Sequence, residues 1–128
     1  MARKIINTDL APAPIGPYNQ AVWAGDLLFI SGQIALDPIT GSLRMDNLEV
    51  ETELVMANLK AILKEAGLGF GDVVKTSIFL KDMAFFGQVN EVYGKYFTLG
   101  APARETVQVA GLPKGVNVEI SMIAFRNS

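Results

Sequence analysis

A repeat of apolar residues at every second position near the end of the chain constrains the fold most. Across residues 117–124, every second side chain is apolar: Val118, Ile120, Met122 and Ala124. A period of two places alternate side chains on opposite faces of a strand, so this pattern predicts a strand with one buried face. Further strands are predicted at residues 4–7, 18–24, 27–36 and 72–81, and from Thr106 onwards.

One segment in the middle of the chain has the spacing of a helix. Apolar residues three and four positions apart form a single stripe between Leu48 and Ala66. Asp46, with Glu49 three residues later, fits a capping box at its start, and Gly67 ends it. The charged residues of this segment are interpreted as a solvated helix face: Glu49, Glu51, Glu53, Lys60 and Lys64.

A second helix is predicted from Asp82, as its cap, to about Leu99. Gly87 and Gly94 weaken it, because glycine disfavours helix interiors. Its predicted core-facing residues are Phe86, Val89, Tyr93 and Phe97.

The order of strands, helix, strand, helix and strands predicts an α+β fold in a single domain, residues 1–128. Two helices cover only one face of such a sheet, and the apolar side chains on its other face need a partner. Half of the residues are hydrophobic and the mean hydropathy is +0.30, which is high for a small monomer. We therefore expect an oligomer.

Composition excludes several classes of function. The net charge is −2 and the basic residues are scattered, so nucleic acid is an improbable partner. The chain has no cysteine and no histidine, which removes thiol and histidine catalysis and the usual metal ligands. The N-terminus lacks the apolar run of a signal peptide, and no segment is long enough to span a membrane. We expect a cytoplasmic protein.

Two charged residues near the predicted final strands draw attention. Arg104 stands at the entry of one strand, and Glu119 lies within the next. A planar guanidinium near apolar surface needs an anionic partner, which it binds through two parallel hydrogen bonds. That partner is Glu119, Glu105 or a bound ligand, and the residues alone leave the three possibilities open.

The chain resembles the Rid family of reactive intermediate deaminases, also called YjgF or UK114, over nearly its whole length. The resemblance rests on the order and spacing of several short runs. These runs are residues 15–21 (IGPYNQA), 30–34 (ISGQI), 58–63 (NLKAIL), 74–76 (VKT), 79–83 (FLKDM), 89–93 (VNEVY), 101–113 (APARETVQVAGLP) and 118–120 (VEI).

The resemblance implies a chorismate-mutase-like fold: a mixed sheet with two helices on one face, assembled as a homotrimer with ligand clefts at the subunit interfaces. It also implies hydrolysis of reactive 2-imino acids, such as those formed from 2-aminoacrylate, to 2-oxo acids and ammonia. Such a 2-iminobutanoate/2-iminopropanoate deaminase uses no metal and no organic cofactor, and its ligands are small 2-imino and 2-oxo carboxylic acids.

Matching positions imply roles for individual residues. Arg104 would bind the substrate carboxylate, and Glu119 would position or activate water, although each could instead belong to a structural ion pair. Tyr18 would line the cleft and assist proton transfer, unless it is a core tyrosine. Substrate-binding positions are also implied by the resemblance for Ser31, Gly32, Asn90 and, through its backbone N–H, Thr106; Asn90 could equally be a polar residue on the helix flank.

Two positions depart from the family pattern. Glu105 replaces a residue that is usually small, and Ser121 stands where a second glutamate is common. Strand alternation would turn Glu105 away from Arg104, whereas a bulge would let it compete for the guanidinium. Two rival functions therefore stay open: a non-catalytic, carboxylate-binding or regulatory trimer, and a ribonuclease or translation inhibitor.

Overall fold

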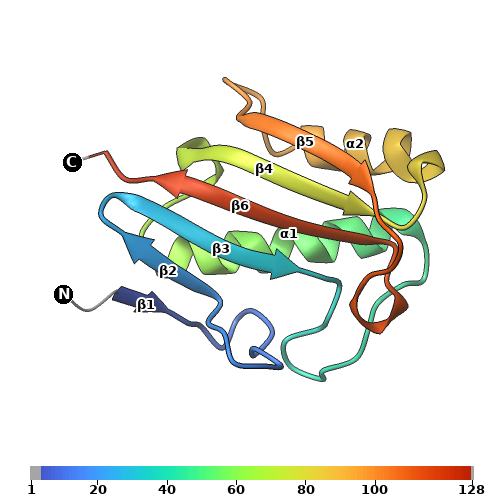
Figure 1. Ribbon diagram of the computed structural model, residues 1–128, viewed down its shortest axis with the longest axis horizontal. Coiled ribbons are helices and arrows are strands. Elements are labelled where there is room, and N and C mark those ends of the chain that lie inside the picture. The colour runs from blue at the N-terminus through green and yellow to red at the C-terminus, as the bar shows by residue number, and fades with distance from the viewer. Residues whose placement is uncertain (1–3, 128) are drawn as a thin grey trace.

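Six strands form one mixed sheet in the computed structural model, which describes residues 4–127. The strands are β1 (Lys4–Ile6), β2 (Ala21–Ala24), β3 (Leu27–Gln33), β4 (Val73–Leu80), β5 (Ala103–Gln108) and β6 (Val118–Phe125). Their order across the sheet is β1-β2-β3-β6-β4-β5 (Figure 1). β4 and β5 run parallel, and the other neighbours are antiparallel. β4 therefore lies between β5, which carries Arg104, and β6, which carries Glu119.

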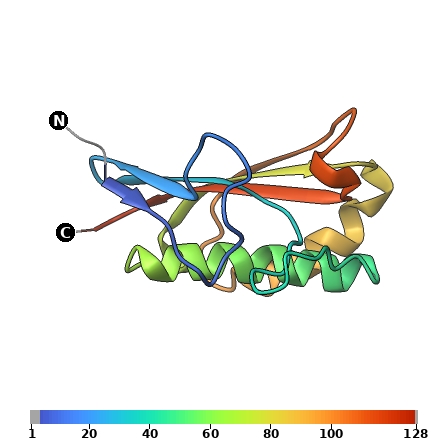
Figure 2. The ribbon, with the colours of Figure 1, turned by 90° about the horizontal axis from the view of Figure 1, so that it is seen from below.

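Both α-helices, α1 (Leu48–Glu65) and α2 (Phe86–Gly94), pack on the same face of this sheet, as Figure 2 shows. Val55, Leu59 and Ile62 of α1 are fully buried against the sheet, which confirms the predicted apolar stripe. The predicted α+β class, with two helices on one face of a mixed sheet, is confirmed. Within residues 4–127, no helix combines the length and the apolar character needed to cross a bilayer.

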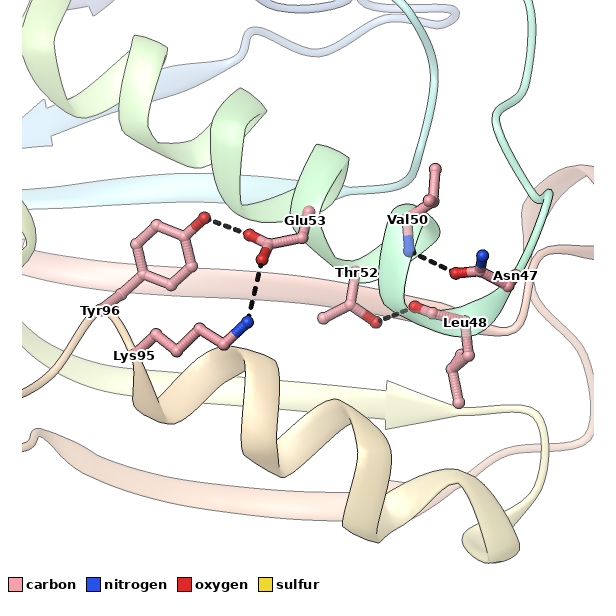
Figure 3. A network of polar contacts seen from close by, with 7 residues as sticks. All are labelled: Asn47, Leu48, Val50, Thr52, Glu53, Lys95 and Tyr96. Atoms are coloured by element: carbon pink, nitrogen blue, oxygen red, sulfur yellow. Dashed lines mark hydrogen bonds and ion pairs between the residues drawn. The ribbon is translucent and has the colours of Figure 1, made fainter.

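The helix ends differ from the sequence prediction. Asn47, and not Asp46, caps α1, because its side chain accepts a hydrogen bond from Val50 N at 2.8 Å (Figure 3). Asp82 caps the short 3-10 helix Met83–Phe85, and α2 begins only after it. α2 ends at Gly94, five residues before Leu99, where glycine's low helix propensity favours termination.

The second strand begins at Ala21 and not at residue 18, and a buried glutamine joins the segment that precedes it to the loop at residues 8–12. Gln20 Nε2 donates to the carbonyls of Thr8, Ala11 and Pro12 at 2.8–3.2 Å. Its Oε1 accepts from Thr8 N at 2.7 Å. These bonds satisfy the loop backbone and fix the segment that carries Tyr18.

Glu51 contradicts the interpretation of the α1 charges as a solvated face. Its side chain is fully buried, and its two carboxylate oxygens accept hydrogen bonds from the backbone N and the Nδ2 of Asn117, each at 2.8 Å. A buried carboxylate requires such donors. Glu51 therefore ties α1 to the loop that leads into β6.

The face of the sheet turned away from the helices, here called the open face, carries large apolar side chains. Ile5, Phe29, Val107 and Phe125 are each 39–51% exposed there. A polar row crosses the same face, because Ser77 of β4 is the register partner of both Ser121 of β6 and Glu105 of β5. The open face is thus a mixed apolar and polar surface with no covering layer in the described chain.

Candidate functional site

Arg104 lies on the helix face of β5, beside two aromatic rings of α2. Its register partner is the buried Thr76 of β4, whose side chain faces the helices. The guanidinium carbon lies 5.0 Å from the ring centroid of Tyr93 and 5.6 Å from that of Phe86. Both distances are within the range of cation–π attraction. Arg104 is only partly buried, so its donor groups can reach a ligand.

No anionic side chain among residues 4–127 pairs with Arg104. Ser77 Oγ instead donates a hydrogen bond to the Glu105 carboxylate, and Lys75 Nζ lies 3.1 Å from the same carboxylate. The hydrogen bond from Ser77, which has the larger effect, and the contact with Lys75 hold the pKa of Glu105 below its usual value. Glu105 therefore faces away from Arg104. The strand has no bulge at this point, so Glu105 does not compete for the guanidinium.

Thr106 lies two residues after Arg104, on the same face of β5. Its hydroxyl oxygen is buried and has no hydrogen-bond partner among the described residues. Asn90 is exposed one turn after Phe86 on α2 and is therefore on the same side of the helix. The guanidinium donors of Arg104, which pair with no acidic side chain of residues 4–127, give this part of the chain a capacity to bind a polar ligand.

Glu119 lines a separate pocket, here called the Glu119 pocket. Other lining residues include Tyr18, Gln20, Gly32 and Pro113. Burial raises the pKa of Glu119 above its ordinary value. A raised pKa brings a carboxyl closer to the range in which it can both accept and return a proton.

Tyr18 is 47% exposed and lines the Glu119 pocket, so it is not a core tyrosine. Its hydroxyl accepts a 3.4 Å hydrogen bond from Ile15 N, which places it at the edge of the pocket. Gly32 lies directly under Glu119. Ser31 does not line this pocket, and its hydroxyl donates to Asn19 O at 2.7 Å, a bond that fixes the loop.

Arg104 and Glu119 lie on opposite faces of the sheet within one chain. Arg104 is level with Thr76 of β4, and Glu119 is level with Phe79. Residues three apart on a strand point to opposite faces, so Arg104 faces the helices and Glu119 faces the open side. The possibility of an ion pair between these two residues of the same chain is therefore wrong.

Sequence reasoning missed the aromatic residues beside Arg104. Phe86 and Tyr93 were expected only as core residues, yet Phe86 is 37% exposed and both rings contact the guanidinium. Their spacing of seven places them on one side of the helix, which was the available signal. Within residues 4–127, no group of three or more acidic side chains that could hold a metal ion occurs.

The fold and these groups define a small α+β protein. It has an arginine that can bind an anion, and a carboxyl group with a raised pKa that lines a pocket. The family model for endoribonuclease L-PSP matches residues 8–126. The chain belongs to this family, which is the Rid/YjgF family, as the sequence resemblance indicated.

Individual relatives agree with this assignment over nearly their whole length. A mouse protein named 2-iminobutanoate/2-iminopropanoate deaminase is 50% identical over 124 residues, which cover 97% of this chain and 92% of the mouse protein. RidA from the Antarctic bacterium Psychrobacter has a TM-score of 0.93 at 44% identity, covering 97% and 100% of the two chains. TdcF of E. coli, solved with bound serine, has a TM-score of 0.92 at 43% identity, covering 97% and 99%.

Proposed function

We propose that this chain is a 2-iminobutanoate/2-iminopropanoate deaminase that hydrolyses reactive 2-imino acids to 2-oxo acids and ammonia. The observation that carries the proposal is the partly buried Arg104, whose guanidinium has aromatic neighbours but no anionic partner among the described residues. Such a group suits the carboxylate of a small acid. The 50% identity to the mouse deaminase and the serine bound by TdcF, itself a small carboxylate, support this substrate class.

The site is formed by two copies of the chain. Arg104 and Glu119 face opposite sides of the sheet, so one small substrate reaches both only if a second copy supplies one of them. The exposed apolar residues of the open face, including Phe29 and Val107, give the copies a surface on which to pack. A homotrimer with three such clefts fits these requirements.

The chemistry follows from the two groups. The substrate carboxylate binds Arg104, which holds the C=N carbon next to the Glu119 pocket of the neighbouring copy. Glu119 accepts a proton from water as the water oxygen bonds to the imine carbon, and it then returns this proton to the nitrogen, which gives the neutral carbinolamine. The hydroxyl proton of the carbinolamine next passes through Glu119 to the nitrogen as the C–N bond breaks, so ammonia leaves, the 2-oxo acid forms and Glu119 is again a carboxylate. Tyr18, at the edge of the pocket, is placed to bind the water or relay the proton.

Decay of 2-iminopropanoate, generated in place by a pyridoxal-phosphate enzyme that dehydrates serine, tests this proposal. Wild type and Arg44→Ala should accelerate the decay equally, because Arg44 pairs with Asp46 on the surface. Arg104→Ala should lose the acceleration. Equal turnover by Arg104→Ala and wild type would contradict the proposal.

A second candidate is a non-catalytic protein that binds small carboxylates. Arg104 alone would suffice for that role, since it lies apart from Glu119 in the chain. Saturable binding of 2-oxobutanoate that depends on Arg104, without any deaminase rate, would favour this candidate. RNA cleavage that is lost in Arg104→Ala would instead favour a ribonuclease.

A further inference from the structure

We propose that Tyr93 and Phe86 form an aromatic platform that positions Arg104 for the substrate carboxylate without occupying its hydrogen-bond donors. The inference rests on the proposed function and assigns two positioning residues to that site. Its basis is the placement of both rings within 5.6 Å of the guanidinium carbon.

A ring and a carboxylate hold an arginine in different ways. A carboxylate binds the N–H donors of the guanidinium and neutralises it, so a substrate carboxylate would have to displace it. A ring attracts the cation through its π face and leaves the donors available. The aromatic platform therefore restrains Arg104 before the substrate arrives, which lowers the entropy lost on binding.

Tyr93 is itself fixed on every side. It is 5% exposed, and its hydroxyl bonds Thr76 Oγ1 at 2.9 Å. Thr76 is the register partner of Arg104, so the same residue of β4 locates both the ring and the arginine. The ring of Phe97 packs against Tyr93 with a centroid distance of 4.7 Å. Burial also raises the pKa of Tyr93, so the ring stays neutral at physiological pH.

The segment that carries Tyr93 is anchored to α1 just beyond the end of α2. Tyr96 OH donates to Glu53, and Lys95 Nζ lies 3.5 Å from the same carboxylate (Figure 3). Phe70 packs against Tyr96 at 5.1 Å and against Phe97 at 5.4 Å. The aromatic platform therefore lies on a helix that is tied to α1, whereas Arg104 lies on the edge strand β5.

The test compares four variants for 2-iminopropanoate turnover and for calorimetric affinity towards 2-oxobutanoate. Phe86→Leu and Tyr93→Leu remove one ring each, and Tyr93→Phe keeps the ring but removes the hydroxyl. Phe70→Leu is the control, because Phe70 belongs to the same aromatic cluster and packs on Tyr96 and Phe97. Phe86 is 37% exposed, so its variant is expected to fold even if Tyr93→Leu does not.

The ring-removing variants should raise KM and weaken 2-oxobutanoate binding by about three- to thirtyfold, the size of one cation–π contact, with a smaller change in kcat. Tyr93→Phe, which keeps the ring, should lose less affinity than Tyr93→Leu, and Phe70→Leu should bind as wild type does. In an Arg104→Ala background, Phe86→Leu should have no further effect on affinity.

Two results would overturn the inference. Wild-type affinity in folded Phe86→Leu and Tyr93→Leu would show that the rings only pack. An equal loss in the Phe70→Leu control would show a general loss of order. Failure of the proposed function is distinguishable, because wild type itself would then not turn over 2-iminopropanoate, while the effect of the rings on 2-oxobutanoate affinity could still be measured. If wild type also fails to bind 2-oxobutanoate, the inference falls with the proposed function.

Discussion

Gly32 and Glu119 are packed so closely that a side chain at residue 32 would displace the Glu119 carboxylate. A Cβ at Gly32 would lie 2.9 Å from Cδ of Glu119 and 3.0 Å from its Cγ, and closer still to one carboxylate oxygen. The glycine has an ordinary backbone conformation, so space and not φ demands it. Gly32 therefore determines where the Glu119 carboxylate lies in its pocket.

Gly32→Ala should displace the carboxylate and reduce kcat/KM by at least about tenfold, because small displacements of a catalytic group are costly. The measurement is steady-state turnover of 2-iminopropanoate. Gly71→Ala is the matched control, since a Cβ there meets nothing within 4 Å. Full activity in Gly32→Ala would mean that the position of Glu119 is not important for turnover.

The pH dependence of turnover should report Glu119. Burial raises its pKa, and the deprotonated carboxylate is the form that accepts a proton. Activity should therefore fall, as the pH is lowered, at a higher pH than an ordinary glutamate would give. The acid limb of kcat/KM against pH measures this, and Glu119→Gln should lose most of the rate. An acid limb at the ordinary glutamate pKa would contradict the assignment.

Glu105→Gln should leave the affinity for 2-oxobutanoate within about twofold of wild type, because Glu105 does not contact Arg104. A tenfold change would need about 1.4 kcal/mol of binding free energy, which the loss of a charge outside the cleft does not supply. Its carboxylate bonds Ser77 and Lys75 on the open face. Calorimetric titration is the measurement. A substantially tighter affinity would show that Glu105 reaches the cleft.

The buried Glu51 should contribute far more to stability than its neighbour Glu49. Glu51→Ala leaves two donors of Asn117 without their charged acceptor, at a cost of about 2–4 kcal/mol in the free energy of unfolding. Glu49→Ala, on the exposed side of α1, should change it by less than about 0.5 kcal/mol. Urea unfolding of both variants gives the comparison, and equal values would contradict it.

The stability that Tyr96 contributes should be lost in strong alkali, when its hydroxyl ionises. Burial, with the Glu53 carboxylate beside the hydroxyl, raises the pKa of Tyr96 to about 12. The native state holds this proton more tightly than the unfolded chain, so the stability from this group is present below pH 10 and lost between about pH 10 and about pH 12. Urea unfolding across this range should show a larger loss in wild type than in Tyr96→Phe, in which Tyr93 is left as a tyrosine with a raised pKa. An identical pH dependence in both would contradict it.

Local patterns in the sequence predict much of the fold. The alternation at Val118, Ile120 and Met122 matches buried positions of β6, and the stripe of α1 is buried as expected. The extent of α2 was overestimated, because a following apolar segment that includes Phe97 continues the helical spacing past Gly94. The N-cap of α1 is Asn47 and not Asp46, and the sequence could not separate the two because both residue types are good N-caps.

The arrangement of the site depends on non-local pairing, which local patterns do not report. β4 inserts between β5 and β6, and this register places Arg104 and Glu119 on opposite faces. The burial of Glu51 depends likewise on Asn117, 66 residues away. The residue types of the candidate site were predictable, whereas their distribution over two faces was not.

Each site should take Arg104 from one copy and Glu119 from another, and complementation tests this arrangement. Arg104→Ala and Glu119→Gln chains, each expected to be inactive alone, are coexpressed in equal amounts so that they assemble together. If the two residues come from different copies, about one quarter of the sites carry both wild-type residues, and about that fraction of wild-type activity should return. If no activity returns from assemblies shown to contain both variants, both residues act from the same copy and the shared site does not exist.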